Sequence, residues 1–316
     1  MIVDVLLLIA GLALVVLGAD ALVDGASGLA RKAGISEFVI GLTIVGFGTS
    51  CPELVVSITG ALGGNADISV GNVIGSNIFN TLLILGLTAV ILPVAITGKN
   101  KKLDIPIMVA VTFILVLLCA VGEISLLSGI VLLVLFVAYI AVCFKTDKAQ
   151  EESPEEESSF FARIGSHTAG AVVLILAGLV ALVAGGRIFV DSACTLARAM
   201  GVSDKFIAIT ILAAGTSLPE LATSVVAAVK RKGQLALGNI LGSNVFNILL
   251  ILGASALITP LSLAGMDLVD MAVVLLSALL LPLFAFTGGK NRIDRAEGLV
   301  MLAVFIGYYF YLIAKI

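Results

Sequence analysis

Two glutamates, Glu53 and Glu220, lie deep inside long apolar stretches of the chain. Every other acidic residue falls near the end of such a stretch or within a polar linker. A charge at the centre of a membrane helix costs about 2.5–3.5 kcal/mol on insertion scales, and no Lys or Arg lies at similar depth to pair with either acid. We therefore expect a bound cation to supply the missing charge. The alternative is a pair of protonated, hydrogen-bonded glutamates.

Hydroxyl and amide side chains accompany both acids at helical spacing. Thr49 and Thr216 each precede a glutamate by four residues, which places each pair on one helix face. Carboxylate, hydroxyl and amide oxygens are ligands for hard cations, so the pattern predicts a site for Ca²⁺ or Na⁺ rather than Zn²⁺ or Cu⁺. The next apolar stretch of each region carries a second polar series with the same spacing: Asn72, Ser76 and Asn80, and Asn239, Ser243 and Asn247.

The prolines before the two acids are expected to free backbone oxygens. Pro52 and Pro219 have no backbone N–H, so within a helix they leave the carbonyls of Gly48 and Gly215 without their usual donors. Glycine at these positions and at Gly46 also permits local unwinding. Free carbonyls at membrane depth are tolerated where they line a polar cavity. We therefore expect backbone oxygens near both acids.

Both acids belong to a duplicated segment. Residues 41–93 and 208–260 align without a gap at an offset of 167, and 25 of the 53 aligned positions are identical. The identities include the two acids, the prolines before them and the GNxxGSNxFN runs, so they are not apolar filler. The similarity extends upstream to 9–36 and 176–203. Because the apolar N-terminal region belongs to the repeat, we expect a membrane span there and not a cleaved signal peptide.

Composition predicts an all-α integral membrane protein. Of the 316 residues, 60% are hydrophobic and 12% are charged, whereas soluble domains carry about a quarter charged residues. The net charge is −3 and no basic tract suggests nucleic-acid binding. The four cysteines have no metal-type spacing and are expected to be buried small side chains. Apolar windows predict ten transmembrane helices, at about 2–22, 37–62, 69–92, 103–121, 124–144, 168–189, 204–229, 235–258, 266–287 and 296–314.

The distribution of basic residues predicts the orientation of these spans. Alternate loops on one side hold fourteen of the 18 Lys and Arg residues, which places that side in the cytoplasm and both termini outside. Five spans separate equivalent points of the two copies, and an odd number reverses direction, so the copies form two inverted five-helix repeats. We expect residues 1–144 to form the first repeat, 145–167 a cytoplasmic acidic linker and 168–316 the second repeat.

The paired motifs resemble the two α-repeats of the calcium/cation antiporter superfamily. GTSCPEL with GNVIGSNIFN, and GTSLPEL with GNILGSNVFN, are similar to its sodium/calcium exchanger branch in a short prokaryotic form. The resemblance implies ten helices, of which the second, third, seventh and eighth enclose the ions while the first and sixth slide. It implies antiport of Ca²⁺ against Na⁺ by alternating access in the cell membrane of a prokaryote, and no enzymatic activity.

The same resemblance implies roles for individual residues. Glu53 and Glu220 would be ligands shared by Ca²⁺ and Na⁺, and Thr49 and Thr216 would offer backbone carbonyls to Ca²⁺. Asn80 and Asn247 would complete the centre. Some relatives, notably potassium-dependent exchangers, carry Asp where this chain has Asn247, so the resemblance argues against potassium co-transport. The residues that would contribute to flanking sodium sites are Gly46, Ser50, Ser76, Ala213, Ser217 and Ser243.

Three other functions are alternatives to sodium/calcium exchange. Ca²⁺/H⁺ antiport through the same glutamates is the nearest, because two carboxylates in one cavity raise each other's proton affinity. A cation channel has less need of inverted repeats, and an enzyme would require a nucleophile–base arrangement or a nucleotide loop, which the chain lacks. The expected partners are therefore Ca²⁺ and Na⁺, with H⁺ as the alternative, and the lipid bilayer. No prosthetic group, nucleic acid or obligate protein partner is expected.

Overall fold

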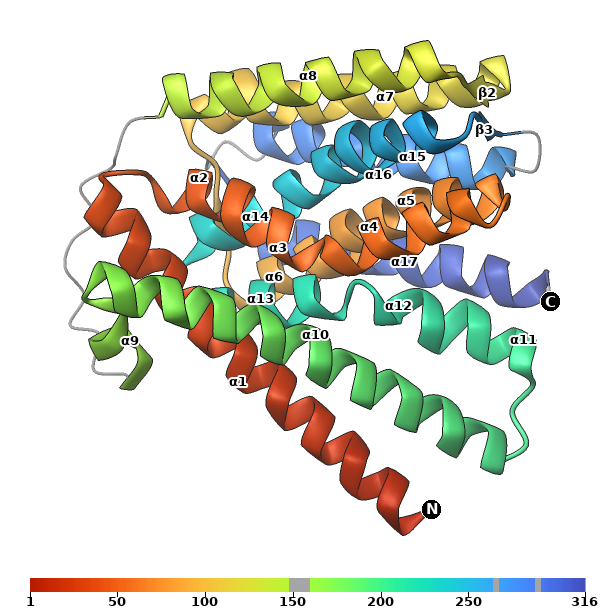
Figure 1. Ribbon diagram of the computed structural model, residues 1–316. Helices are drawn as coiled ribbons and strands as arrows, with labels where there is room; N and C mark the ends of the chain where they lie inside the picture. The colour runs from red at the N-terminus through yellow and green to blue at the C-terminus, as the bar shows by residue number, and fades with distance from the viewer. Residues whose placement is uncertain (148–159, 264–266, 288–290, 316) are drawn as a thin grey trace.

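The protein is nearly all helical (Figure 1). The structure, a computed structural model, describes residues 1–147, 160–263, 267–287 and 291–315. In the first half of the chain the elements are α1 (Ile2–Ala33), α2 (Glu37–Ile40), η1 (Gly41–Val45), α3 (Gly46–Thr49), α4 (Cys51–Leu62), α5 (Ala66–Ile78), η2 (Phe79–Ile84), α6 (Leu85–Ile91), β1 (Val94–Ala95), η3 (Asn100–Asp104), α7 (Ile105–Val121), β2 (Glu123–Ile124) and α8 (Leu126–Lys145).

After one additional short helix, the second half repeats this order of elements, except that its described residues contain no counterpart of η3. Elements marked η are π-helical in both halves. The second half contains α9 (Phe160–Gly165), α10 (Thr168–Ala199), α11 (Asp204–Ile207), η4 (Ala208–Leu212), α12 (Ala213–Gly215), α13 (Leu218–Val229), α14 (Gly233–Phe246), η5 (Asn247–Leu252), α15 (Gly253–Ile258), β3 (Leu261–Ser262), α16 (Leu268–Thr287), β4 (Arg292–Ile293) and α17 (Arg295–Ala314).

The two longest helices, α1 and α10, pack antiparallel along one side of the bundle (Figure 1). Each has 32 residues, so both extend well beyond the apolar windows that predicted them. Small residues bring their backbones into contact: a Cβ added at Gly18 would lie 2.9 Å from the carbonyl oxygen of Gly178, and one at Gly11 would lie 2.9 Å from that of Gly185. Close approach through glycine is typical of helix pairs in membranes.

Eight helices in the described part of the chain are long and apolar enough to cross a membrane, or nine if the bent pair Glu37–Thr49 and Cys51–Leu62 counts as one span. They correspond to nine of the ten predicted windows. The remaining window, 204–229, is divided among α11, η4, α12 and α13, and Leu218–Val229 alone is a shorter apolar helix. The polar turn at Thr216 and Ser217 interrupts the helix there.

Four two-residue strands modify the expectation of an all-α fold. β1 pairs antiparallel with β4, with Val94 opposite Ile293, and β2 pairs antiparallel with β3, with Ile124 opposite Leu261. Each pair joins the first half of the chain to the second. The main buried core lies around α5, α6, α14 and α15, where side chains such as Leu82 and Leu249 are fully enclosed.

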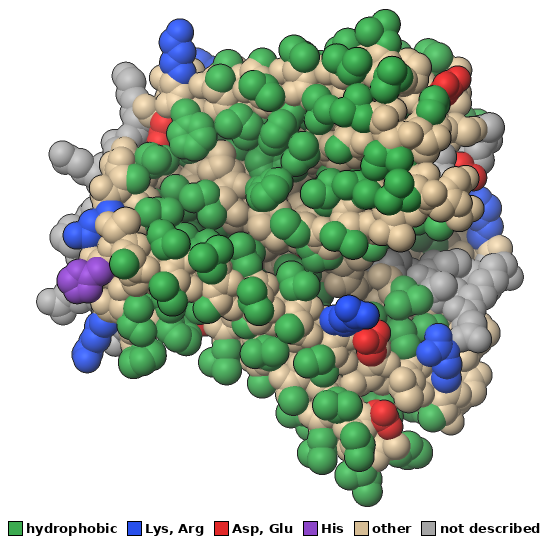
Figure 2. Space-filling model, in the orientation of Figure 1, with side chains coloured by type: hydrophobic (Ala, Val, Ile, Leu, Met, Phe, Trp, Pro, Cys, Tyr) green, Lys and Arg blue, Asp and Glu red, His purple; other side chains and the backbone are tan. Residues whose placement is uncertain are grey.

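The outer surface is that of a membrane protein. Figure 2 shows apolar side chains over most of one face, with most charged side chains towards its two edges. Large exposed apolar residues occur on α1, α7, α8, α10, α16 and α17. Such a surface would be an aggregation hazard in water and suits contact with lipid. All four cysteines are free. The acidic run of the expected linker lies outside the described residues.

Candidate ion-binding site

Each acid lies in the first turn of a helix that begins after a break. The helix pair on either side of Ser50 is bent by 46°, and Glu53 follows in the first turn of α4. In the second copy, a turn at Thr216 and Ser217 separates α12 from α13, whose first turn holds Glu220. The prolines therefore lie at the start of new helices, where proline is tolerated. The expected unwinding occurs after the glycines and not at them, since Gly46 and Gly48 are helical.

The Glu53 carboxylate is fully buried and accepts two hydroxyl hydrogen bonds. Ser217 donates to its Oε1 at 3.0 Å and Ser76 donates to the same oxygen at 3.3 Å. The two hydroxyl oxygens are themselves 3.0 Å apart. Asn72 donates through Nδ2 to the backbone oxygen of Glu53 at 3.1 Å and to Ser57 Oγ at 3.0 Å. The side chain is thus oriented by residues of both halves.

Glu220 is also fully buried, in a closely related setting. Ser50 donates to its Oε1 at 3.0 Å. Asn239 donates through Nδ2 to the backbone oxygen of Glu220 at 3.5 Å and to Ser224 Oγ at 3.0 Å. Ser50 belongs to the first half and Ser217 to the second, so each half supplies a hydroxyl to the acid of the other. The two acids therefore belong to one centre.

Thr49, Gly46 and Ser243 form a third part of this centre. Thr49 donates its hydroxyl to the backbone oxygen of Val45 at 3.0 Å, and its Oγ1 lies 3.2 Å from Asn239 Oδ1. Ser243 donates to the backbone oxygen of Gly46 at 3.4 Å. The polar side chains of this group are buried. The backbone oxygen of Gly46, before the break, thus faces a polar group of the other half.

Asn80 and Asn247 lie in π-helical segments. Asn80 is in η2 and Asn247 begins η5, and π-turns within helices are frequent at functional sites. Asn247 donates through Nδ2 to Asn77 Oδ1 at 3.0 Å and to Ser76 Oγ at 3.3 Å. Neither side-chain polar atom of Asn80 has a hydrogen-bond partner. The π-helical geometry was not expected from the sequence.

Four side-chain oxygens of the centre are buried without a hydrogen-bond donor: Glu53 Oε2, Glu220 Oε2, Asn80 Oδ1 and Asn247 Oδ1. An unsatisfied buried acceptor is costly, and more so when the group is charged. No Lys, Arg or His within the described ranges forms an ion pair with either glutamate at this site. These oxygens are therefore available to cations, and their hard donor character suits Ca²⁺ and Na⁺.

Two further predicted site residues, Ala213 and Thr216, lie where the second copy is interrupted. Thr216 lies in the turn before α13 and is only half-buried, while its counterpart Thr49 is fully enclosed. Ala213 is the first residue of α12. Among the described residues, no group of three or more His, Cys, Asp or Glu side chains could hold a metal ion. The candidate site thus combines two carboxylates with neutral oxygens.

Sequence reasoning missed Asn77 and Asn244. Asn77 donates to the backbone oxygen of Asn244 at 3.1 Å and accepts from Asn247. Asn244 donates to Thr81 Oγ1 at 2.8 Å. Both asparagines are buried and connect the two halves beside the acids. They follow Ser76 and Ser243 directly, so they fall outside the series spaced by four, although both copies retain them. That retention was the available signal.

A membrane protein of many spans whose interrupted helices carry buried, unpaired carboxylates is typical of secondary transporters. A family model described as sodium/calcium exchanger protein matches residues 3–145 and 170–314. The chain therefore belongs to the sodium/calcium exchanger family and is a transporter, not an enzyme.

Relatives and solved structures agree with this assignment over the full chain. The sodium/calcium exchanger MaX1 of Methanosarcina acetivorans is 34% identical over 342 aligned residues, covering 97% of each chain. Membrane protein MJ0091 of Methanocaldococcus jannaschii is 36% identical, covering 94% of this chain and 93% of that protein. The structure of the sodium-calcium exchanger NCX_Mj, soaked with 2.5 mM Na⁺ and 0.1 mM Ca²⁺, matches with a TM-score of 0.85 at 34% identity, covering 100% and 99% of the two chains. The membrane-exchanger fold is therefore shared.

Proposed function

We propose that this protein exchanges Ca²⁺ for Na⁺ by alternating access through the centre formed around Glu53 and Glu220. The observation that carries the proposal is the pair of fully buried carboxylates, each with one oxygen that has no hydrogen-bond donor. Two carboxylates neutralise one Ca²⁺, and Na⁺ can replace it at the same oxygens. The transported ions are the only non-protein species that the proposal requires.

Each predicted ligand has a role in this proposal. Glu53 and Glu220 bind both ions, and Thr49 and Thr216 offer backbone carbonyls to Ca²⁺. Asn80 and Asn247 close the centre as neutral ligands, which leaves no third carboxylate for potassium co-transport. The residues proposed for flanking sodium sites are Gly46, Ser50, Ser76, Ala213, Ser217 and Ser243. The hydroxyl hydrogen bonds between halves support this grouping for the serines Ser50, Ser76 and Ser217.

Ten spans in two inverted repeats are the proposed architecture. On this view residues 204–229 form the seventh span, with α13 as its second part. Val94 of β1 and Leu261 of β3 are 167 residues apart and hold the same place in the two copies, and each pairs with a strand of the other half. The exchange of hydroxyl donors between Ser50 and Ser217 follows the same rule. Such reciprocity supports a two-fold relation between halves.

Alternating access is supported by unequal packing around the two equivalent helices α14 and α5. A Cβ added at Gly238 would lie 2.1 Å from the backbone oxygen of Phe38, and one at Gly242 would lie 2.3 Å from that of Leu42. At Gly71 and Gly75, the same positions in α5, an added Cβ would meet nothing within 4 Å. One side of the centre is therefore closely packed while the other is open beside α5, as expected of a transporter in one of its two states.

We further propose that the protein lies in the cell membrane of a prokaryote with both termini outside. The described part of the 145–167 linker region would then face the cytoplasm, together with most Lys and Arg residues. If more than two Na⁺ replace each Ca²⁺, every cycle moves net charge. One charge crossing 100 mV contributes about 2.3 kcal/mol, or roughly a fifty-fold gradient. Sodium entry and membrane potential would then both drive Ca²⁺ export.

Proton coupling is the second candidate function. The donor-free oxygens of Glu53 and Glu220 are suited to protons as well as to metal ions, and this observation keeps the alternative open. The serine hydroxyls around both acids favour sodium, because a proton needs no cage of neutral oxygens. The two couplings therefore predict different driving gradients for the same carboxylates.

The deciding experiment is ⁴⁵Ca uptake into proteoliposomes that contain the purified protein. An outward sodium gradient is compared with an outward proton gradient of equal size, and empty liposomes are the control. Uptake driven by sodium and stimulated by an inside-positive potential supports electrogenic Na⁺/Ca²⁺ exchange. Uptake driven by protons alone would overturn the sodium proposal, and uptake that needs neither gradient would indicate a channel.

A further inference from the structure

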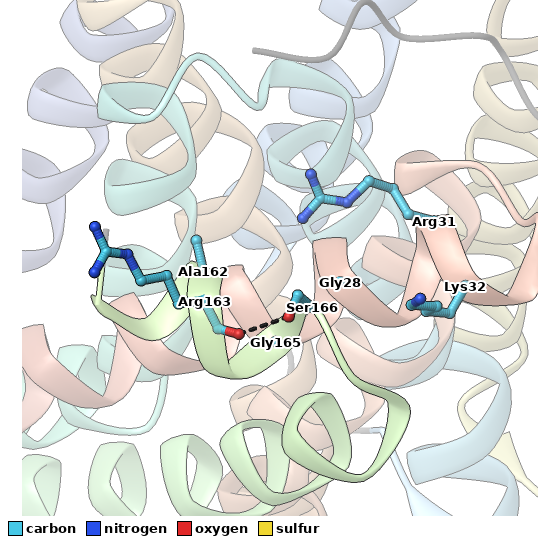
Figure 3. A pocket seen from close by; sticks show the side chains of 7 residues that line it. All are labelled: Gly28, Arg31, Lys32, Ala162, Arg163, Gly165 and Ser166. Carbon is cyan, nitrogen blue, oxygen red and sulfur yellow. Dashed lines mark hydrogen bonds between the residues drawn. The ribbon is translucent and has the colours of Figure 1, made fainter. Parts of the chain in front are cut away.

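A basic hollow lies where the last turns of α1 meet α9, away from the buried acids (Figure 3). Its volume is about 550 Å³. Arg31, Lys32 and Arg163 are the basic side chains that line it, and no acidic side chain is among the lining residues in the described part of the chain. Arg31 and Lys32 come from α1 and Arg163 from α9, so two helices contribute the basic side chains that line the hollow (Figure 3).

The backbone contact between α1 and α9 creates the hollow. A Cβ added at Gly28 would lie only 2.2 Å from the carbonyl oxygen of Gly165, so α9 rests directly on α1. Gly28, Gly165 and Ala162 are buried and form the floor. The basic side chains and Ser166 are exposed and form the rim. A larger residue at Gly28 would lift α9 away and change the shape of the hollow.

The hollow lies at the membrane–water boundary. α1 ends at Ala33 and α10 begins at Thr168, so the ends of two apolar 32-residue helices meet here. Phe160 of α9 is 73% exposed and packs edge-to-face against Phe161. Exposed Val173 and Leu176 continue the apolar surface along α10. Aromatic and basic residues at the end of an apolar span are typical of the headgroup level of a bilayer.

We propose that this hollow binds the phosphate of an anionic phospholipid headgroup. Arg and Lys side chains bind phosphate oxygens through charge-assisted hydrogen bonds. The Ser166 hydroxyl on the rim donates to the backbone oxygen of Arg163 at 2.7 Å, so the basic side chains carry the proposed contact (Figure 3). Basic residues are favoured at helix C-termini. That preference alone does not explain why basic side chains from both α1 and α9 line the same hollow. Free phosphate shares the same chemistry. The exposed apolar residues of α9 and α10 favour the lipid, because they offer a surface to its acyl chains.

This inference is independent of the transported ions, because lipid retention is measured without transport. The full-length protein is equilibrated in detergent with mixed phosphatidylglycerol and phosphatidylcholine, and bound lipids are counted by native mass spectrometry. Wild-type protein is expected to retain phosphatidylglycerol in preference. Arg163→Gln and Lys32→Gln are each expected to weaken that retention about fivefold, the value of one basic charge near an anionic surface.

Lys145→Gln is the matched control, because it removes one exposed positive charge at the end of α8, outside the hollow. It is expected to leave retention unchanged. Equal losses in all three variants would overturn the proposal by showing general charge attraction. Displacement of phosphatidylglycerol by inorganic phosphate at comparable concentration would overturn the lipid assignment in favour of a free anion. Retention that is unchanged in Arg163→Gln and Lys32→Gln would overturn the site itself.

Discussion

The two copies of the polar centre share most of their hydrogen bonds and differ in those of one pair of equivalent serines, Ser76 and Ser243. Asn72 and Asn239 make the same pair of hydrogen bonds to the acid and serine of their own copy. Glu53, in contrast, accepts from two hydroxyls and Glu220 from one, because Ser243 donates to the backbone of Gly46 and not to an acid. The repeated sequence therefore reproduces the bonds of the asparagines and of Ser50 and Ser217, whereas Ser76 and Ser243 make different contacts in the described conformation.

The two copies also differ in sequence at one charged position. The Nζ atom of Lys230, between α13 and α14, lies 2.5 Å from Oδ1 of Asp20 and 2.6 Å from Oδ1 of Asp24, both in α1. Burial opposes its charge, but these two carboxylates raise the pKa of Lys230 above its ordinary value, so it stays protonated. The equivalent position in the first copy is Gly63. One end of the molecule thus has an ion triad that the corresponding region of the other copy does not repeat.

The largest expected effect tests whether the two acids remain equivalent despite their different donors. Glu53→Gln and Glu220→Gln should each reduce sodium-driven ⁴⁵Ca uptake at least about a hundredfold. Either change leaves only one carboxylate to neutralise the two charges of Ca²⁺. Glu123→Gln, an exposed acid of β2, is the control and should transport normally. Wild-type uptake by either buried variant would remove that acid from the mechanism.

The ion triad gives the next largest effect, on stability. Lys230→Gln should lower the free energy of unfolding by about 3 kcal/mol, because it removes the cation that both Asp20 and the nearly buried Asp24 contact. The lower end of the usual range applies, since the Lys230 side chain is 21% exposed. Thermal unfolding in detergent measures the change. Arg187→Gln breaks the exposed Arg187–Asp191 pair of α10 and should have almost no effect. Equal shifts in both variants would contradict the distinction.

Unequal packing of the equivalent glycines predicts a third effect. Gly238→Ala should destabilise the described conformation by about 2 kcal/mol, because its methyl group would overlap the backbone of α2. Gly71→Ala should be nearly neutral, since the space beside it is open. Thermal unfolding measures the two stabilities. If Gly71→Ala is as harmful as Gly238→Ala, the two sides are packed alike, and the difference described between them is wrong.

The smallest expected effect concerns the serines. Ser76→Ala removes a donor from Glu53 and an acceptor from Asn247, whereas Ser243→Ala removes one long bond to a backbone oxygen. A hydrogen bond to a charged group contributes about 1.5 kcal/mol or more, so Ser76→Ala should raise the KM for Na⁺ about tenfold and Ser243→Ala less. Initial rates of exchange at varied Na⁺ concentration measure both. Equal changes would show that the asymmetry does not persist during transport.

Much of the fold and the two acids could be predicted, because both depend on patterns in the chain. Apolar length indicated the spans, and the depth of Glu53 and Glu220 separated them from the other acids. The helix was expected to unwind at Gly46 and Gly48, but it breaks after them, at Ser50. The reason is that proline is best accommodated in the first turn of a new helix. The seventh window was not found as one long helix for a similar reason, the turn at Thr216 and Ser217.

The remaining features could not be derived from the sequence. The π-helical segments that hold Asn80 and Asn247 depend on packing between neighbouring helices, which no local pattern specifies. Asn77 was overlooked because it leaves the series spaced by four and acts across the two halves. Packing that differs between identical glycine positions is also invisible to a repeat comparison, since both copies carry the same residues there.

The exchange of hydroxyl donors has an evolutionary consequence. Ser217 serves Glu53 and Ser50 serves Glu220, so neither half contains a complete centre. If the halves are inverted as proposed, an ancestor that encoded one copy would have needed two chains inserted in opposite directions to assemble the same site. Fusion of two such genes would have made that pairing permanent and would have allowed each half to change separately, as at Lys230 and its counterpart Gly63.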